Sequence, residues 1–132
     1  AGCTVEEREE YEPHLAAGNV VFAGVDYAAI VALAQREADL IVWDGGNNDF
    51  PFVRPDLHIV VVDALRPGQC TSYHPGEAVL RMADVVIINK ADAASSADVQ
   101  AVSDEVVPLL IGELLGEDAV LLFDDQFQKI SQ

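Results

Sequence analysis

Three apolar runs of the same form most constrain how this chain can fold. They are "DLIVWD" at 39–44, "LHIVVVD" at 57–63 and "DVVIINK" at 84–90, and each ends in polar side chains. Runs that are apolar at successive positions are typical of parallel strands covered on both faces. Two shorter runs, "NVVFAGV" at 19–25 and "AVLLF" at 119–123, also have strand character. The sequence therefore predicts five strands.

Helical segments alternate with these runs. Asp26 is suited to cap a helix over "YAAIVALAQREA", and Thr4 with Glu7 is suited to cap an acidic helical turn that must end by Pro13. Further helices are predicted over 75–83 and from 95 to about 115, the second interrupted by Pro108 and Gly112. Alternating strands and helices predict an α/β domain with a mostly parallel sheet and helices on both faces.

The composition limits the kinds of partner. With 51% apolar residues the chain can form a core, and no apolar run approaches the roughly 20 residues that cross a bilayer. The net charge of −16 repels nucleic acid and anionic membranes. So acidic a chain, with so few lysines, suggests adaptation to high salt, although an ordinary acidic protein remains an alternative. Two isolated cysteines indicate a reducing compartment, and we expect a soluble cytoplasmic protein.

The polar residues that end the three long runs are Asp44, Asp63, Asn89 and Lys90. In open parallel sheets, ligands bind at the carboxyl ends of the strands. We therefore expect these side chains at one edge of the sheet, facing a ligand.

The loop after residue 43 has the form of a magnesium and phosphate site. Four apolar residues followed by Asp44 resemble a Walker B strand, whose carboxylate binds Mg²⁺ because hard cations prefer oxygen ligands. Gly45 and Gly46 allow close approach of the backbone to a phosphate. A helix cap or a turn is the alternative for Asp44, and a turn is equally open for Asp63. The residues that follow, Asn47, Asn48 and Asp49, either face substrate or form a turn.

"NKAD" at 89–92 directly follows an apolar run. In GTP-binding proteins an Asn-Lys-x-Asp at this place reads the base: the Asp accepts two hydrogen bonds from guanine, and the Lys stem packs on the ring. Asn89, Lys90 and Asp92 are thus candidate base-binding residues. The alternative is a polar strand end with a solvated Lys90.

Cations that persist in so acidic a chain are candidates for binding an anionic ligand. Arg54 and Arg66, in the two long loops, fit that role better than Arg81, which we expect to pair with an acidic neighbour on a helix. His58 is expected to be structural. His14 and His74 are expected in loops, where they could meet an acidic or phosphorylated substrate.

One motif is absent from the sequence. There is no Gly-x-x-x-x-Gly-Lys-[Ser/Thr], so the main phosphate cradle of a P-loop enzyme is missing. We expect this chain alone to bind nucleotide poorly and to show no measurable turnover.

Taken in order, the segments quoted above, together with "CTVEEREEYEPH", "RPG" and "HPGEAVLRMA", resemble the cyclic 2,3-diphosphoglycerate synthetase family of P-loop enzymes. The resemblance runs from about Cys3 to Asp92, and residues 93–132 form a divergent tail. It implies a P-loop α/β domain whose Walker A loop precedes this segment. The chain is thus expected to be either a single α/β domain over 1–132 or the C-terminal part of such a domain.

The resemblance implies an enzyme that closes 2,3-diphosphoglycerate into its cyclic phosphoanhydride with ATP and Mg²⁺. Asp44 would then hold Mg²⁺, while Asp49, Arg54 and Arg66 would face a phosphorylated small-molecule substrate. ATP conflicts with the guanine preference of "NKAD", so GTP stays open. A nucleotide-switch or metallochaperone-like GTPase and a non-catalytic fragment are the alternatives, and the rest of a longer chain or a second copy is the expected partner.

Overall fold

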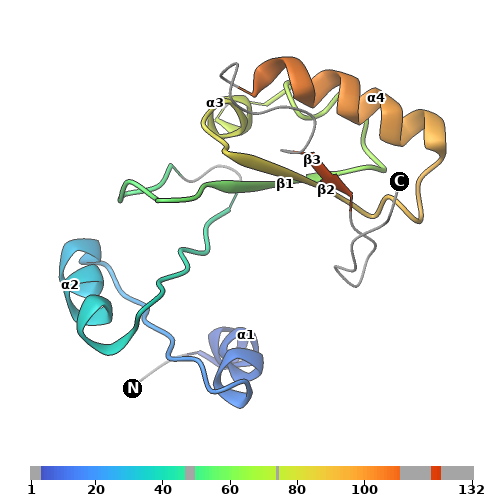
Figure 1. The fold of residues 1–132 in the computed structure, drawn as a ribbon. Coiled ribbons are helices and arrows are strands. Elements are labelled where there is room, and N and C mark those ends of the chain that lie inside the picture. The colour runs from blue at the N-terminus through green and yellow to red at the C-terminus, as the bar shows by residue number, and fades with distance from the viewer. Residues whose placement is uncertain (1–3, 47–49, 74, 111–119, 123–132) are drawn as a thin grey trace. The chain divides into compact units, whose positions relative to one another are not determined.

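The computed structural model describes residues 4–46, 50–73, 75–110 and 120–122. The chain divides into two compact units, Ala1–Trp43 and Asp44–Gln132. Each unit has its own secondary structure (Figure 1).

The first unit begins with α1 (Val5–Ala16). The predicted capping box is confirmed: Glu7 N donates to Thr4 Oγ1 at 3.2 Å, and Thr4 N donates to Glu7 Oε2 at 2.7 Å. The predicted end of the helix at Pro13 is wrong, because α1 continues for one more turn. Proline removes only the bond that its own N–H would make, and Ala17 N still donates to Pro13 O at 3.1 Å.

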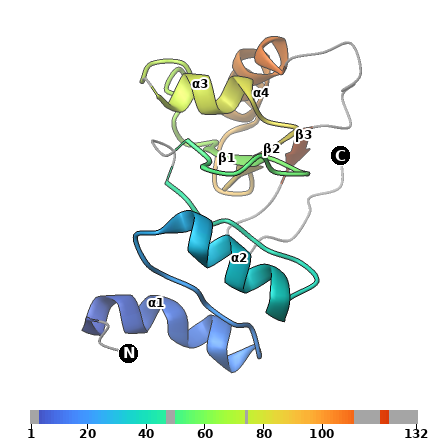
Figure 2. The same cartoon turned by 90° about the vertical axis from the view of Figure 1, so that its left-hand side faces the viewer.

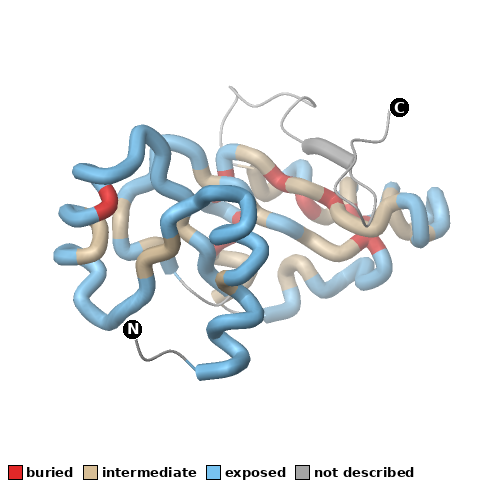
Figure 3. The backbone as a smooth tube through the Cα atoms, turned by 90° about the horizontal axis from the view of Figure 1, so that it is seen from below, coloured by how far each residue is buried: buried red, intermediate tan, exposed pale blue. Residues whose placement is uncertain are grey.

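The second helix of this unit is α2 (Tyr27–Glu37). Asp26 caps it as predicted, since Asp26 Oδ1 accepts from Ala29 N at 3.0 Å. Ala34 is buried, and the rings of Tyr27 and Trp43 lie with centroids 5.1 Å apart. In Figure 3 nearly all of α1 is exposed, and α1 has no buried residue.

The strands predicted over 19–25 and 39–44 are wrong: the structure has no strand in either segment. Leu40 and Val42 are each 80% exposed. Strand conformation is stabilised by hydrogen bonds to a neighbouring strand and by burial of its side chains. These two segments consist of residues that favour a strand, but they lack the hydrogen bonds to a neighbouring strand that would stabilise one.

The second unit is the predicted α/β unit. Its sheet has the order β1-β2-β3, with β1 (Ile59–Asp63), β2 (Val85–Asn89) and β3 (Val120–Leu122) all parallel. The connections are α3 (Gly76–Arg81) and α4 (Ser96–Val106). The strands expected over 57–63, 84–90 and 119–123, and the parallel α/β class, are confirmed.

The core of this unit lies between one face of the sheet and the two helices. Val86 and Ile88 of β2 meet Leu80 of α3 and Val102 and Val106 of α4 in one cluster. Strands that lie in the sheet in chain order, joined by crossovers of one hand, place their helices on the same face. Figures 1 and 2 both show α3 and α4 on that face. On the opposite face Ile59 and Val61 are about half exposed.

The helix predicted from 95 to about 115 ends earlier. Ser95 caps α4 by accepting from Asp98 N at 3.1 Å, but α4 ends at Val106 and a short 3-10 turn, η1 (Val107–Leu109), follows. Pro108 explains this end, because it has no N–H to continue the helical ladder. Gly112 lies outside the described residues.

No helix in the described ranges combines the length and apolarity needed to cross a membrane.

Candidate functional site

The carboxyl ends of β1 and β2 bring predicted site residues together. Asp63 and Asn89 are partners at the last position of the parallel ladder, and Lys90 follows directly. Paired positions of parallel strands point to the same face. Asp63 and Asn89 are therefore neighbours on one face at the edge where ligands of open α/β sheets bind.

Asp63 is the most heavily contacted carboxylate of this edge. Its Oδ2 accepts from Lys90 Nζ at 2.7 Å and lies 3.7 Å from Arg66 Nε, while its Oδ1 accepts from Leu65 N at 2.9 Å. Burial raises the pKa of this carboxyl, but the Lys90 hydrogen bond, the Leu65 amide and the two cationic charges outweigh it and lower the pKa overall. Both oxygens are engaged, which fits the turn role considered for Asp63 better than a metal role.

Lys90 has a left-handed backbone, with φ of 60°. A lysine side chain gives no local compensation for this conformation, which costs about 1–2 kcal/mol in L-residues. Strain of this kind is concentrated at functional sites. The turn that follows is closed by Ala93 N and Ala94 N, which both donate to Lys90 O at 3.2 Å, and it leads into α4.

Asn89 and Asp92 complete the motif. Within the described part of the chain, Asn89 Oδ1 is buried and has no hydrogen-bond partner. A buried acceptor without a partner is rare in folded proteins and calls for an explanation such as a bound donor. Asp92 is exposed, so its carboxylate is accessible to a ligand.

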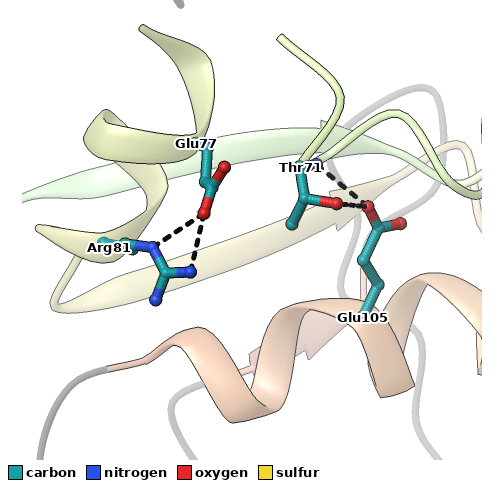
Figure 4. Close-up of polar contacts among 4 residues, drawn as sticks. All are labelled: Thr71, Glu77, Arg81 and Glu105. Atoms are coloured by element: carbon teal, nitrogen blue, oxygen red, sulfur yellow. Dashed lines mark hydrogen bonds and ion pairs between the residues drawn. The ribbon is translucent and has the colours of Figure 1, made fainter. Parts of the chain in front are cut away.

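The loop between β1 and α3 is fastened to α4 by Glu105, a residue that the sequence did not single out. Glu105 Oε1 accepts from Thr71 N at 2.9 Å and from Thr71 Oγ1 at 2.8 Å (Figure 4). Its Oε2 accepts from Gly68 N at 2.9 Å. A negative charge in the last turn of a helix interacts unfavourably with the helix dipole. This unusual position was the one sequence signal that Glu105 has a specific role.

Cys70 lies in the same loop and is half-buried. Burial, followed by the negative charge of Glu105, raises the pKa of its thiol to about 11. A thiol of this kind is protonated at neutral pH and is a poor nucleophile.

The structure describes part of the glycine-rich loop that follows Trp43. Asp44, Gly45 and Gly46 are exposed, and so is Arg54. Asn47, Asn48 and Asp49 lie outside the described residues, as does His74. No group of three or more His, Cys, Asp or Glu suited to a metal ion occurs in residues 4–46, 50–73, 75–110 and 120–122.

Two of the remaining predictions are confirmed and one is wrong. Arg81 pairs with Glu77 on α3, with Nη2 2.6 Å from Oε1 (Figure 4). His58 Nδ1 lies 3.1 Å from Met82 O in a structural contact. His14 is not in a loop but in the last turn of α1, because the helix continues past Pro13.

Known proteins resemble this chain in sequence. Residues 14–111 match the family described as "Cyclic 2,3-diphosphoglycerate synthetase, P-loop domain". The chain is 53% identical over 124 residues to the protein named arginine synthetase ArcE of Thermococcus kodakarensis, and the match covers 94% of this chain. The chain spans only 28% of the length of that relative. No solved structure matches. Because the family match covers most of the chain and agrees with its parallel α/β unit, the chain belongs to the family of the cyclic 2,3-diphosphoglycerate synthetase P-loop domain.

Proposed function

We propose that this chain forms the base-binding side of an ATP- or GTP-dependent synthetase that activates its substrate by phosphoryl transfer. The observation that carries the proposal is the carboxyl edge of β1 and β2. There a buried Asn89 Oδ1 without a partner among the described residues adjoins the strained Lys90. A nucleotide base supplies amino and ring N–H donors that suit such an acceptor.

The residues at this edge fit a purine base. Asp92 is exposed and accepts hydrogen bonds, and the Lys90 side chain is 42% exposed, so its stem is open to a ring. Asn89, Lys90 and Asp92 would hold the base. Gly45 and Gly46 would face the phosphates, and Asn47, Asn48, Asp49, Arg54 and Arg66 would face the substrate.

Asp44 is the candidate ligand for Mg²⁺. Its exposed carboxylate has the oxygen chemistry that the ion prefers, whereas both oxygens of Asp63 are already engaged. When bound, Mg²⁺ neutralises the charge that develops on the phosphates. The contribution of the chain itself is positioning: it holds the base at one end of the nucleotide and presents Arg54 and Arg66 to an anionic substrate.

Nucleotide titration of the complete natural protein tests the base site. We expect saturable binding of ATP or GTP in the presence of Mg²⁺, and we expect Asp92→Ala to weaken binding and reduce discrimination between the two bases. Asp104→Ala, a control at an exposed position of α4, should leave discrimination unchanged. If neither ATP nor GTP binds, the proposal is refuted. GTP hydrolysis that does not depend on any substrate would favour a nucleotide switch.

The first candidate substrate is 2,3-diphosphoglycerate, and it rests on membership of the family. Its two phosphates and carboxylate match the cations and Mg²⁺ assigned to the site. The test supplies ATP, Mg²⁺ and 2,3-diphosphoglycerate and follows formation of the cyclic phosphoanhydride by ³¹P NMR. Asp44→Asn should abolish magnesium-dependent product formation.

The second candidate is arginine formation, which is favoured by the 53% identity to a protein named arginine synthetase. Both reactions need nucleotide-driven activation, so the same edge of the sheet serves either. Supplying arginine with ADP and phosphate, or with AMP and pyrophosphate, and measuring ATP formation tests the reverse reaction. Product in one assay and not in the other decides between the two substrates.

A further inference from the structure

We infer that Asp63 is a positioning residue that sets Lys90 in the conformation that receives the nucleotide base. The inference rests on the proposed function of Lys90 and extends it to a residue that the Asn-Lys-x-Asp motif does not include. Two of the seven Lys and Arg residues of this chain converge on the Asp63 carboxylate.

The Asp63 carboxylate is itself well fixed. It lies at the last paired position of β1, opposite Asn89, and its Oδ1 accepts from the backbone N–H of Leu65 at 2.9 Å. Its side chain is only 24% exposed. Asp63 is thus a rigid, negatively charged point beside the segment that would bind the base.

Lys90 is the opposite case, with a long side chain on a strained backbone. A free lysine side chain has considerable rotamer freedom, and ordering it on ligand binding reduces affinity. The 2.7 Å contact with Asp63 Oδ2 already directs the ammonium to one place. The stem between this contact and the left-handed backbone is then held at both ends before any ligand arrives, which is preorganisation.

Nucleotide affinity of Asp63→Asn, in the complete natural protein, tests this role. Asparagine retains the acceptor for Leu65 N and the shape of the side chain but lacks the charge that fixes Lys90. We expect affinity for the preferred nucleotide to fall about tenfold, which corresponds to about 1.4 kcal/mol. Glu77→Gln is the matched control, because it removes another close carboxylate–cation pair of this unit, and it should leave affinity unchanged.

Two measurements separate positioning from a general structural effect. Acylation of the Lys90 amine, followed by peptide mass spectrometry, should be faster in Asp63→Asn than in the wild type. The double variant Asp63→Asn with Lys90→Gln should bind no more weakly than Lys90→Gln alone. If Asp63→Asn does not fold, Asp63→Glu keeps the charge but displaces it, and it should bind several-fold more weakly than the wild type.

The outcomes distinguish this inference from the proposed function. A wild type that binds neither ATP nor GTP refutes the proposed function. Suppose instead that the wild type binds nucleotide and that Lys90→Gln binds it more weakly. If Asp63→Asn, or its substitute Asp63→Glu, then binds as tightly as the wild type, only the role of Asp63 is overturned.

Discussion

Glu105 and Thr71 are joined by two hydrogen bonds that link α4 to the loop after β1, across 34 positions of the sequence. The same carboxylate accepts a third bond, from Gly68 N. The loop that carries Arg66 is thus fixed at its start by Asp63 and further along by Glu105. The position of a candidate substrate-binding arginine therefore depends on a helix that begins just after the candidate base-binding motif.

Removing this carboxylate should destabilise the second unit. Glu105→Ala leaves two backbone N–H groups and one hydroxyl to find other partners, and we expect the free energy of unfolding to fall by about 2 kcal/mol. Urea denaturation measures the change. Asp104→Ala is the control, since Asp104 is exposed and contacts Gln100 on the same helix, and it should cost at most about 0.5 kcal/mol. Equal effects of the two substitutions would contradict the importance of this contact.

Cys70 should be a slow nucleophile in the folded protein. Its pKa of about 11 lies above the ordinary value of 9.0, so at pH 8 the thiolate is roughly a hundredfold rarer than in an unperturbed thiol. Alkylation in a Cys3→Ser background should be correspondingly slower in the folded than in the urea-unfolded protein. Glu105→Gln removes a charge that raises this pKa and should speed alkylation several-fold. Equal rates in the folded and unfolded states would contradict the shift.

The same shift gives a pH dependence of stability. Between pH 9 and about 11 the folded state retains the Cys70 proton that the unfolded state has lost. The contribution of this group to stability is therefore complete below pH 9 and decreases as the pH rises toward 11. Cys70→Ser should flatten this part of the stability profile, as measured by urea midpoints at successive pH values.

Local pattern predicted most of the second unit. The apolar runs correctly predicted β1 and β2, because each of these strands has its neighbouring strand within the chain. Ser95 correctly predicted the start of α4. The run at 39–44 failed for the opposite reason: its residues favour a strand, but the described chain offers it no ladder. The local sequence shows that a segment favours strand conformation, but it does not show whether a neighbouring strand is present to pair with it.

Contacts between distant residues were beyond sequence patterns. The edge formed by Asp63 and Asn89 was predicted, because parallel strands end together. The ion pair between Asp63 and Lys90 was not, since it depends on the left-handed turn at Lys90. Glu105 was missed because nothing in its neighbourhood shows that Thr71 and Gly68, more than thirty positions earlier, would lie beside it.

The core between the sheet and its helices should be sensitive to truncation of its buried side chains. Leu80 of α3 is 1% exposed, and Leu80→Ala should reduce the free energy of unfolding by about 2–5 kcal/mol. Leu65, in the loop after β1, is 49% exposed, so Leu65→Ala should cost well under about 1 kcal/mol. Chemical denaturation of both variants measures the difference. Similar costs would show that this core is not the main source of stability.

Salt should stabilise this protein. Its net charge is −16, and α1 alone carries five glutamates, so self-repulsion opposes the folded state at low ionic strength. At 1 M salt the screening length falls to about 3 Å, which suppresses repulsion between exposed charges. The melting temperature should therefore rise as KCl increases from 0.1 to 2 M, by about the same amount as with NaCl if screening is the cause. No rise in either salt would contradict adaptation to high salt.

Comparing Lys90→Gly with Lys90→Ala should separate the cost of backbone strain at Lys90 from the contribution of its side chain to nucleotide binding. Both variants lose the ammonium that contacts Asp63, so both should lose nucleotide affinity. Only glycine adopts the φ of 60° without strain, so Lys90→Gly should be more stable than Lys90→Ala by about 1 kcal/mol. Urea denaturation of the two variants measures this difference, and nucleotide titration measures the shared loss. If alanine were as stable as glycine, the left-handed turn would cost nothing, and the strain at Lys90 would not need a functional explanation.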